Sequence, residues 1–272
     1  MKRIEDRPMS VVEDKLVYKS VGDVDLSFYT FRPSDADPEK LLAGILFFHG
    51  GGWVGGDPQQ FFQQSRYLAE RGMLAVSAQY RLIETHGTTP FECVTDGKSA
   101  VRWLREHAEE LGLDPERLAA GGGSAGGHVA ASAAILPGFD EEGENTGVSS
   151  RPNALVLFNP VLDTTASGWQ NGARMLGKRA RELSVMHHVE PGVPPCLILH
   201  GHDDDAVPYE NAERFCRRMQ EAGNRCELVG YEGEGHGFFN RGRDEGTGPF
   251  LQTIREADAF LRSLGYLHDV AT

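Results

Sequence analysis

The sequence predicts an α/β fold in which helices flank a mostly parallel central sheet and an antiparallel hairpin lies at one edge. Continuous apolar runs such as residues 41–49 (LLAGILFFH) are typical of strands that are buried on both faces. Strand and helix patterns alternate along the chain with short connections, as they do in parallel sheets. Residues 15–33 instead alternate apolar and polar side chains around a Gly-Asp turn, which predicts the hairpin.

The same patterns assign the other elements within a single expected domain over residues 1–272. Residues 138–151 are polar and acidic, so we expect a surface loop there. Residues 164–193 are too long for an ordinary connection and predict a small lid-like insertion of short helices, with little or no further cap. Strands are expected over residues 73–80, 117–121, 152–160, 194–201 and 226–233, and helices over residues 58–72, 91–111, 125–136, 208–223 and 248–264.

The composition is that of an ordinary globular protein with an acidic surface. The net charge is −13, from 27 Lys and Arg against 40 Asp and Glu. A surface of that charge repels nucleic acid and anionic membranes, so neither is expected as a partner. No run approaches the ~20 apolar residues of a membrane-spanning helix. The N-terminus lacks the apolar region of a signal peptide, so we expect a cytoplasmic protein, or a secreted one if a leader has been removed.

The four cysteines are Cys93, Cys196, Cys216 and Cys226, and they form no C-x-x-C pair and fit no zinc-binding spacing. A disulfide between Cys216 and Cys226 is an alternative, because they lie near a predicted helix end and a strand start. Reduced thiols are favoured in a cytoplasmic protein. The sequence therefore predicts no metal site.

The segment AAGGGSAGG fits two motifs that require different chemistry. Gly121, Gly123 and Gly126 have the G-x-G-x-x-G spacing of a dinucleotide-binding loop, which cradles pyrophosphate. Gly122 and Gly126 also flank Ser124 in the G-x-S-x-G spacing of a nucleophile elbow, which exposes a serine for covalent catalysis. The surrounding sequence has to separate the two interpretations.

The dinucleotide interpretation fails in its context. It requires an acidic residue about 20 positions on, at the end of the next strand, to bind the ribose. The acids at that distance fall in the polar segment 138–151, where no strand is expected. The same glycine spacing recurs at Gly50, Gly52 and Gly55 in a chain with 33 glycines, so it arises easily here. We therefore expect no cofactor.

The nucleophile-elbow interpretation fits its context better. Ser124 lies between a predicted strand and a predicted helix, as the elbow requires. Gly122 and Gly126 leave room where strand and helix would otherwise collide, and the N-terminus of the helix favours developing negative charge. On this segment alone, a serine that merely caps the helix is an equal alternative.

A second glycine-rich turn, in the stretch FFHGGGW, directly follows a buried strand. An oxyanion hole needs backbone N–H groups that approach the substrate closely, and glycines allow that approach. The candidates are the N–H groups of Gly51 and Gly52, together with that of Ala125 after the nucleophile. We expect His49 to brace this loop through hydrogen bonds rather than to transfer protons.

A serine nucleophile also needs a histidine base and an acid that orients it, and the sequence offers candidates for both. His236 lies between glycines after the last predicted strand, where it can reach Ser124. The stretch LILHGHDDDAVP offers Asp203, Asp204 and Asp205 at the end of an earlier strand, where an acid can orient the histidine. Serine, aspartate and histidine occur in the order of the α/β-hydrolases.

Together these motifs resemble the hormone-sensitive-lipase-like esterases and lipases of the α/β-hydrolase superfamily, over about residues 40–262. HGGGW, GGSAGGH, HGHDDDAVP and GHGF are most similar to the small, cap-poor group that includes bacterial feruloyl and acetyl-xylan esterases. The resemblance implies that Ser124 is the nucleophile and His236 the base. It assigns the acid of the H-G-x-x-D motif to Asp204. The implied activity is that of a serine carboxylic-ester hydrolase on short-acyl esters, through a catalytic triad and without a cofactor.

The chain also departs from the larger relatives of that group. Gly123 stands where many of them carry Asp, and we expect little or none of their N-terminal helical cap, because the predicted hairpin begins near residue 15. We therefore expect an open acyl pocket walled by residues 164–193. Trp53 and Trp169 are candidates to line it, with surface or core packing as the alternative for each.

The expected substrate is a small-molecule or carbohydrate-linked ester. An amidase or formamidase on the same fold is the alternative. A non-catalytic ligand receptor is less favoured, because such proteins typically lack a triad member.

Overall fold

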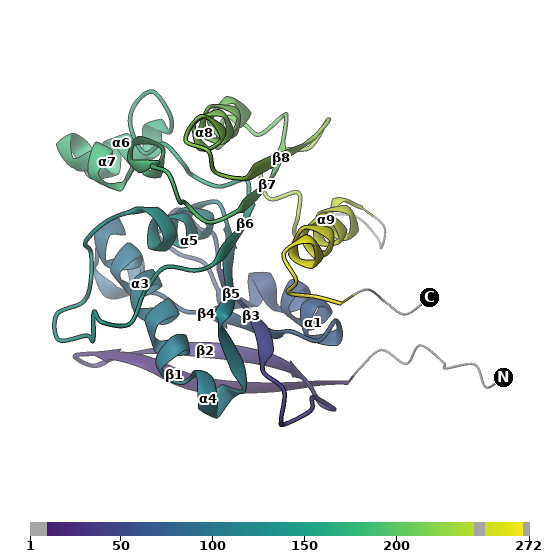
Figure 1. Ribbon diagram of the computed structural model, residues 1–272. Helices are drawn as coiled ribbons and strands as arrows, with labels where there is room; N and C mark the ends of the chain where they lie inside the picture. The colour runs from purple at the N-terminus through teal and green to yellow at the C-terminus, as the bar shows by residue number, and fades with distance from the viewer. Residues whose placement is uncertain (1–9, 242–247, 269–272) are drawn as a thin grey trace.

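The structure is a computed structural model that describes residues 10–241 and 248–268. Within those residues eight strands form one sheet: β1 (Val11–Val21), β2 (Val24–Pro33), β3 (Leu42–Phe48), β4 (Leu74–Ala78), β5 (Leu113–Gly123), β6 (Ala154–Phe158), β7 (Cys196–Gly201) and β8 (Cys226–Tyr231). Their order across the sheet is β1-β2-β4-β3-β5-β6-β7-β8. β2 is antiparallel to both β1 and β4, and the strands from β4 to β8 are parallel (Figure 1). The predicted fold class is confirmed.

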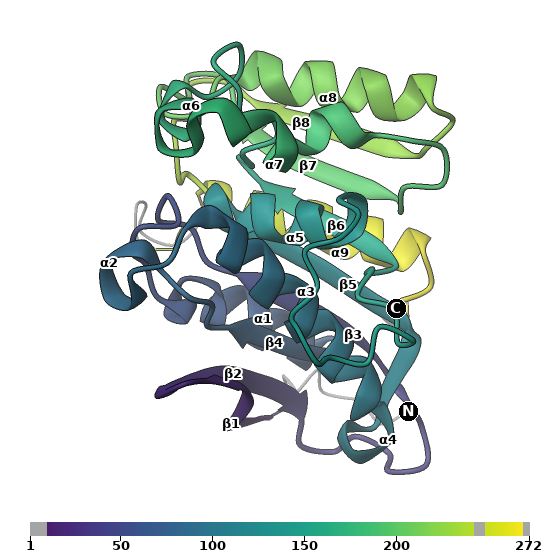
Figure 2. The same ribbon diagram turned by 90° about the vertical axis from the view of Figure 1, so that its left-hand side faces the viewer.

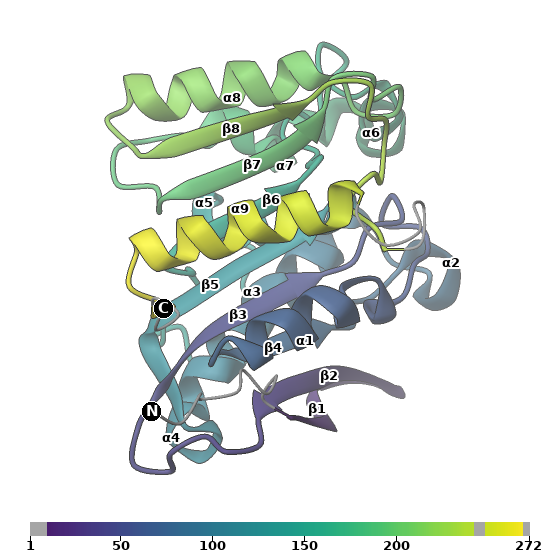
Figure 3. The same cartoon turned by 90° about the vertical axis from the view of Figure 1, so that its right-hand side faces the viewer.

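Helices cover both faces of the sheet. In the described part of the chain they are α1 (Phe62–Glu70), α2 (Ile83–His86), α3 (Pro90–Glu106), α4 (Ala108–Leu111), α5 (Ala125–Ile135), α6 (Gln170–Leu176), α7 (Ala180–Leu183), α8 (Tyr209–Glu221) and α9 (Pro249–Ser263), with short 3₁₀ turns η1 (Pro58–Phe61), η2 (Gly177–Arg179) and η3 (Val185–His188). The helices α3, α5 and α8 lie on one face (Figure 2), and α1 and α9 lie on the other (Figure 3). Each face therefore has its own apolar core, and the central strands are buried on both sides.

Local signals set the bounds of α3. Thr89 and Glu92 form a capping box, in which the Thr89 side chain accepts from a backbone N–H and the Glu92 carboxylate accepts from the N–H of Thr89 at 2.7 Å. Pro90, at the first helical position, lacks the N–H that would need a partner there. The helix ends at Glu106 and a separate turn, α4, follows, where the sequence predicted one helix over residues 91–111.

The strand that carries the glycine-rich segment is longer than predicted. β5 begins at Leu113 rather than at residue 117 and continues to Gly123. Its pairing with β3 shifts register between Leu42 and Gly44, where a bulge adds residues to β5. Its last residues pair with β3 on one side and β6 on the other, which places the segment before Ser124 in the middle of the sheet.

The acidic segment 138–151 is a surface loop, as predicted, and it also forms ion pairs with buried cations. Arg102, which is almost fully buried on α3, forms an ion pair with Asp140 at 2.6 Å and another with Glu144. Arg102 also donates from Nε to a backbone carbonyl of the same segment. The acidic side chains of this surface loop therefore bind the loop to α3.

A second ion-pair cluster joins the hairpin to the rest of the fold. Asp96 on α3 is fully buried and accepts hydrogen bonds from the Nζ of Lys19 on β1 at 2.7 Å and from the guanidinium of Arg81. Glu141 pairs with the same two cations, at 2.5 Å and 2.8 Å. Buried charges are tolerated when they are paired and hydrogen-bonded in this way.

Residues 164–193 form short helices at the carboxyl end of the parallel strands, as the sequence predicted. They contain α6, η2, α7 and η3 between β6 and β7 (Figure 2). His128 on α5 lies beneath them and contacts the carbonyl of Leu183 through Nε2 at 2.7 Å. This segment therefore rests on the helix that begins at Ser124.

Two observations bear on the predicted location. Residues 1–9, which belong to the N-terminal segment on which the signal-peptide argument depends, lie outside the described residues. A search of the residues that the structure describes finds no helix with the length and apolar character needed to cross a membrane.

Candidate active site

Ser124 occupies the turn between β5 and α5 in a strained backbone conformation. Its φ of 54° and ψ of −120° lie in a region that non-glycine residues seldom adopt. The turn is held on both sides, because the N–H of Ser124 donates to the carbonyl of Phe158 at 2.9 Å and its own carbonyl accepts from the N–H of His128 and Val161. The strain therefore presents the hydroxyl at the end of the sheet.

Two glycines allow this turn to form without steric clashes. A Cβ on Gly122 would lie 2.5 Å from the carbonyl oxygen of Phe48, and one on Gly126 would lie 2.1 Å from the same atom. Both distances are far below van der Waals contact, so the prediction that these glycines relieve crowding is confirmed. Gly123, for which the motif itself offered no physical role, faces Phe239: its Cβ would lie 2.4 Å from the ring atom Cζ.

The imidazole of His236 lies between Ser124 and Asp204. Its Nε2 is 3.0 Å from the Oγ of Ser124, and its Nδ1 is 2.8 Å from Oδ2 and 3.0 Å from Oδ1 of Asp204. An ionised carboxylate only accepts hydrogen bonds, so Nδ1 carries the proton and donates a hydrogen bond to Asp204. Nε2 then accepts the hydrogen bond of the serine hydroxyl.

Of the three candidate acids, the structure brings only Asp204 to His236. The Asp204 side chain is fully buried, whereas Asp203 and Asp205 are exposed to solvent. Burial alone would raise the pKa of Asp204. Hydrogen bonds from His200, His236 and the N–H of Val207 outweigh burial and hold that pKa well below its usual range. Asp204 is therefore a carboxylate at neutral pH.

The turn that holds Asp204 explains this selection. Its Oδ1 accepts from the N–H of Ala206 at 3.0 Å and from that of Val207 at 2.8 Å, which folds the carboxylate back into its own loop. On the other side, the Nε2 of buried His200 lies 3.2 Å from Oδ2. The neighbouring aspartates lack these contacts.

The glycine loop after β3 is held by His49, as predicted. The His49 ring is buried, stacks on Tyr80 and contacts the carbonyl of Gly50 through Nδ1 at 2.7 Å. Burial lowers the pKa of His49, which favours the neutral ring. Because the carbonyl and N–H of a trans peptide point in opposite directions, the N–H of Gly51 points away from that ring.

The candidate oxyanion donors are the backbone N–H groups of Gly51, Gly52 and Ala125. The structure shows no hydrogen bond from the N–H of Gly51 or Gly52 within the described residues. Ala125 is the first residue of α5, so its N–H has no acceptor inside the helix. Both glycines line the same cleft as Ser124 and His236.

That cleft has a volume of about 350 Å³. Trp169 contributes to its wall, but Trp53 does not. The Trp53 ring is fully buried behind Trp169, at a centroid distance of 5.2 Å, and packs edge-on against His128. Of the alternatives considered for Trp53, the structure therefore favours core packing, because its ring is fully buried and does not line the cleft.

Several lining residues carry no sequence motif and were not predicted. Phe239 follows the His236 motif but is recognised only from its place against Gly123. The buried Asn159 has a φ of 34°, and its Oδ1 accepts from the N–H of Gly237 at 3.2 Å, which connects β6 to the histidine loop. The remaining unpredicted polar residues of the cleft are Gln60, Asn171 and Asn240.

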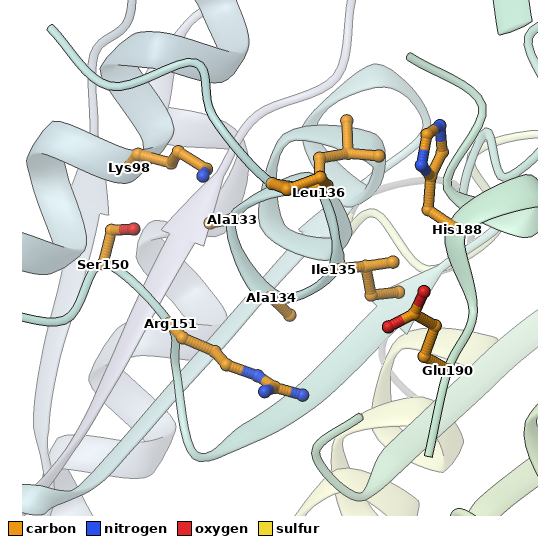
Figure 4. Close-up of a pocket in the computed structure, with 10 residues that line it drawn as sticks. Lys98, Ala133, Ala134, Ile135, Leu136, Ser150, Arg151, His188 and Glu190 are labelled. Carbon is orange, nitrogen blue, oxygen red and sulfur yellow. The ribbon is translucent and has the colours of Figure 1, made fainter. Parts of the chain in front are cut away.

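A second cavity, of about 270 Å³, lies at the opposite end of α5 (Figure 4). Lys98 and Arg151 lie on one side of it, and His188 and Glu190 on the other. Lys98 and Arg151 each donate to a backbone carbonyl, so both cations have structural partners. The cleft at Ser124 instead contains a hydroxyl and an imidazole that are hydrogen-bonded to each other, with the imidazole also bonded to a buried carboxylate.

The described residues also hold the predicted thiols. Cys93, Cys196, Cys216 and Cys226 are buried and free. A search of the described ranges finds no group of three or more His, Cys, Asp or Glu side chains that could hold a metal ion.

Comparison with known proteins agrees with this geometry. A model of the BD-FAE family matches residues 31–219, which is more than half of the chain. The chain belongs to the BD-FAE family. A model described as the dienelactone hydrolase family also matches residues 182–267. These matches confirm the resemblance that the sequence motifs indicated.

The BD-FAE chain is similar over nearly its full length to a solved esterase. Esterase 2 of Thermogutta terrifontis, with propionate bound, superposes with a TM-score of 0.90 at 43% identity, covering 95% of this chain and 97% of that chain. Other structures of that esterase hold butyrate or are phosphorylated by paraoxon. This similarity, together with the sheet order, identifies the α/β-hydrolase fold.

Curated relatives of this BD-FAE chain are longer proteins. It is 31% identical over 216 residues to the probable carboxylic ester hydrolase LipM of Mycobacterium tuberculosis, covering 70% of this chain and 48% of LipM. It is 26% identical over 209 residues to an acetylxylan esterase of Xylanibacter ruminicola, covering 71% of this chain and 40% of that esterase. The chain spans about half the length of the curated relatives it matches, or less.

Proposed function

We propose that this protein is a serine carboxylic-ester hydrolase that acts through an acyl-enzyme. The observation that carries the proposal is the continuous hydrogen-bonded chain from Ser124 through His236 to Asp204, open to a cleft. A serine hydroxyl is a weak nucleophile at its free pKa and needs an adjacent base that is itself oriented by a third group. The three similar proteins described above are named as an ester hydrolase or an esterase, which supports the same reaction class.

In the first half-reaction, Ser124 Oγ attacks the ester carbonyl as His236 Nε2 takes the hydroxyl proton. Asp204 holds the tautomer and stabilises the imidazolium that forms. The N–H groups of Gly51, Gly52 and Ala125 stabilise the tetrahedral oxyanion, at about 2.7–4 kcal/mol per donor by analogy with other hydrolases. The intermediate then collapses, the C–O bond to the alcohol breaks, and His236 returns the proton to the leaving oxygen.

The second half-reaction repeats these steps with water. Water attacks the acyl-enzyme while His236 again accepts a proton, and the carboxylic acid leaves as Ser124 regains its hydroxyl. As written, the catalytic groups in both half-reactions are side chains and backbone N–H groups of this chain, and the reactants are the ester and water.

We further propose short acyl groups as substrates, on small-molecule or carbohydrate-linked alcohols. Phe239 and Trp169 line the cleft, and we propose that residues 164–193, which supply Trp169 and Asn171, act as a small lid-like wall of a single domain. The Thermogutta esterase holds propionate and butyrate, and one curated relative is named an acetylxylan esterase.

The deciding experiment is Ser124→Ala, with Ser34→Ala as an exposed control. We expect the wild type and the control to hydrolyse p-nitrophenyl acetate and to gain one diethylphosphoryl group from paraoxon by mass spectrometry. Ser124→Ala should do neither while it unfolds at a similar temperature. Retained hydrolysis by Ser124→Ala would refute the assignment of the nucleophile. Faster cleavage of a matched amide would reassign the reaction to an amidase.

A further inference from the structure

Gln60 lies beside the glycine loop, on a rigid turn. It belongs to η1, whose start is capped by Asp57, with Oδ1 accepting from the N–H of Gln59 at 2.8 Å. The carbonyl of Pro58, at the first position of the turn, accepts from the hydroxyl of Ser77 on β4 at 2.7 Å. The turn is therefore fastened to the central sheet, and Gln60 extends from it into the cleft that contains Ser124.

The side chain of Gln60 binds the loop directly. Its Oε1 accepts a hydrogen bond from the N–H of Gly50 at 2.6 Å. This contact also fixes the orientation of the side-chain amide, because only the oxygen accepts from an N–H. The amide nitrogen remains a donor at the cleft and forms no hydrogen bond within the described residues.

Two consecutive peptide groups of the loop are anchored in this way. The peptide between His49 and Gly50 is held at its carbonyl by the hydroxyl of Tyr80, at 2.7 Å, and at its N–H by Gln60. The next peptide, between Gly50 and Gly51, is held at its carbonyl by His49 and carries the N–H of Gly51. Of the three anchoring side chains, only Gln60 lines the cleft; the rings of His49 and Tyr80 are buried.

Gly50 cannot hold this orientation by itself, because glycine has the widest choice of backbone conformations. It also lies very close to the nucleophile: a Cβ on Gly50 would lie 3.4 Å from the Cβ of Ser124. A small rotation of the first peptide would therefore move the N–H of Gly51 relative to Ser124.

We propose that Gln60 is a positioning residue for the oxyanion hole: by binding the N–H of Gly50, it directs the N–H of Gly51 toward the oxygen that becomes negative during attack on Ser124. This inference rests on the proposed esterase function. Interactions that strengthen only in the transition state affect kcat rather than KM. Loss of the Gln60 contact should therefore lower kcat and leave KM nearly unchanged.

The test compares Gln60→Met, which keeps the side-chain length but removes both polar atoms, with Gln59→Met, an exposed neighbour in the same turn. On p-nitrophenyl acetate we expect kcat of Gln60→Met to fall by about tenfold or more, because a misplaced donor loses most of its effect. KM should stay within about twofold, and Gln59→Met should match the wild type. Gln60→Ala provides a second variant if Gln60→Met does not fold.

A second readout separates positioning from general disturbance. An alkylboronic acid forms a tetrahedral, anionic adduct with the serine and so mimics the oxyanion. Its inhibition constant should rise in Gln60→Met by the same factor by which kcat/KM falls, with the thermal midpoint preserved. A kcat within twofold of wild type, or an unchanged boronate affinity, would overturn the role of Gln60. Wild-type protein that hydrolyses no ester would instead refute the proposed function.

Discussion

The ring of Phe239 occupies the space that a side chain at position 123 would need. A Cβ on Gly123 would lie 2.4 Å from Phe239 Cζ and 3.1 Å from Cε1. Phe239 is held there by an aromatic cluster, with ring centroids 4.9 Å from Phe158 and 5.6 Å from Phe61. The residue before the nucleophile is therefore glycine because an aromatic wall of the cleft abuts it.

This contact predicts that Gly123→Ala is destabilising and that Phe239→Leu partly rescues it. The added methyl group overpacks the site, at a cost of about 1–3 kcal/mol. Leucine at position 239 lacks the Cζ atom that causes the clash, so the double variant should be more stable than the two single changes imply together. Urea denaturation of the wild type, the two single variants and the double variant measures the coupling free energy between positions 123 and 239.

Gly121→Ala, alone and combined with Phe239→Leu, is the matched control for these variants. Its Cβ would lie 2.6 Å from the backbone oxygen of Val156, which a change at position 239 cannot move. Phe239→Leu should therefore not rescue it. Equal rescue at both glycines would contradict a specific contact between Gly123 and Phe239.

The position of Phe239 also predicts an effect on acyl length. Phe239→Ala should enlarge the cleft and raise the kcat/KM for p-nitrophenyl octanoate relative to acetate by about tenfold, since each fitted methylene contributes about 1–3 kcal/mol. Phe238→Ala is the control, because Phe238 is equally buried but does not line the cleft. An unchanged ratio in Phe239→Ala would place the acyl group elsewhere.

The burial of Asp204 predicts how the three adjacent aspartates differ. Asp204→Asn should reduce kcat by about 10⁴-fold, because the amide can hold His236 in the wrong tautomer. Asp203→Asn and Asp205→Asn should stay within about twofold of wild type, since both side chains are exposed. Steady-state rates at pH 8 measure this. A comparable loss at either neighbour would show that the loop rearranges in solution.

The buried His128 predicts a pH-dependent loss of stability. Burial lowers the pKa of His128 to about 4, even though the hydrogen bond to the carbonyl of Leu183 acts to raise that pKa. The unfolded chain binds a proton near the ordinary pKa of about 6.5. The unfolded state therefore binds more protons between these values, and stability falls as the pH drops from about 6.5 to about 4. The full loss is about 3 kcal/mol.

His128→Gln should remove this part of the pH dependence. The variant is expected to be less stable than wild type at pH 7.5, because it disturbs the contact with Leu183, but the difference should shrink as the pH approaches 4. Urea denaturation at several pH values, between 7.5 and 4, measures the free energy of unfolding. A constant difference across that range would contradict the prediction.

The buried carboxylate of Asp96 predicts a large loss of stability on neutralisation. Asp96→Asn would leave Lys19 and Arg81 with only the partly exposed Glu141 as a shared anion, and breaking a buried ion pair typically costs about 3–5 kcal/mol. Asp37→Asn, which removes an exposed ion pair with Lys40, should change stability by less than about 1 kcal/mol. Equal effects at the two sites would contradict the structural role of the buried cluster.

The sequence by itself determined the sheet, most helices and the order of the site motifs. Strands buried on both faces must be apolar throughout, so β3, β6 and β7 are visible as uninterrupted apolar runs. Gly122 and Gly126 were assigned roles correctly, because the strained turn at Ser124 restricts residue types within two positions along the chain. Apolar runs and glycine positions of this kind can be recognised from residues that are close together in the sequence.

Only the tertiary structure decided the contacts between distant segments. It brought Asp204, the aspartate that the family resemblance indicated, to His236, buried Trp53 behind Trp169, and paired the acidic segment 138–151 with buried arginines. It also placed Phe239 against Gly123, and Gln60 beneath the glycine loop. None of these contacts leaves a periodic pattern in the sequence, because each is set by which side chains the folded strands and turns bring within a few ångströms of one another.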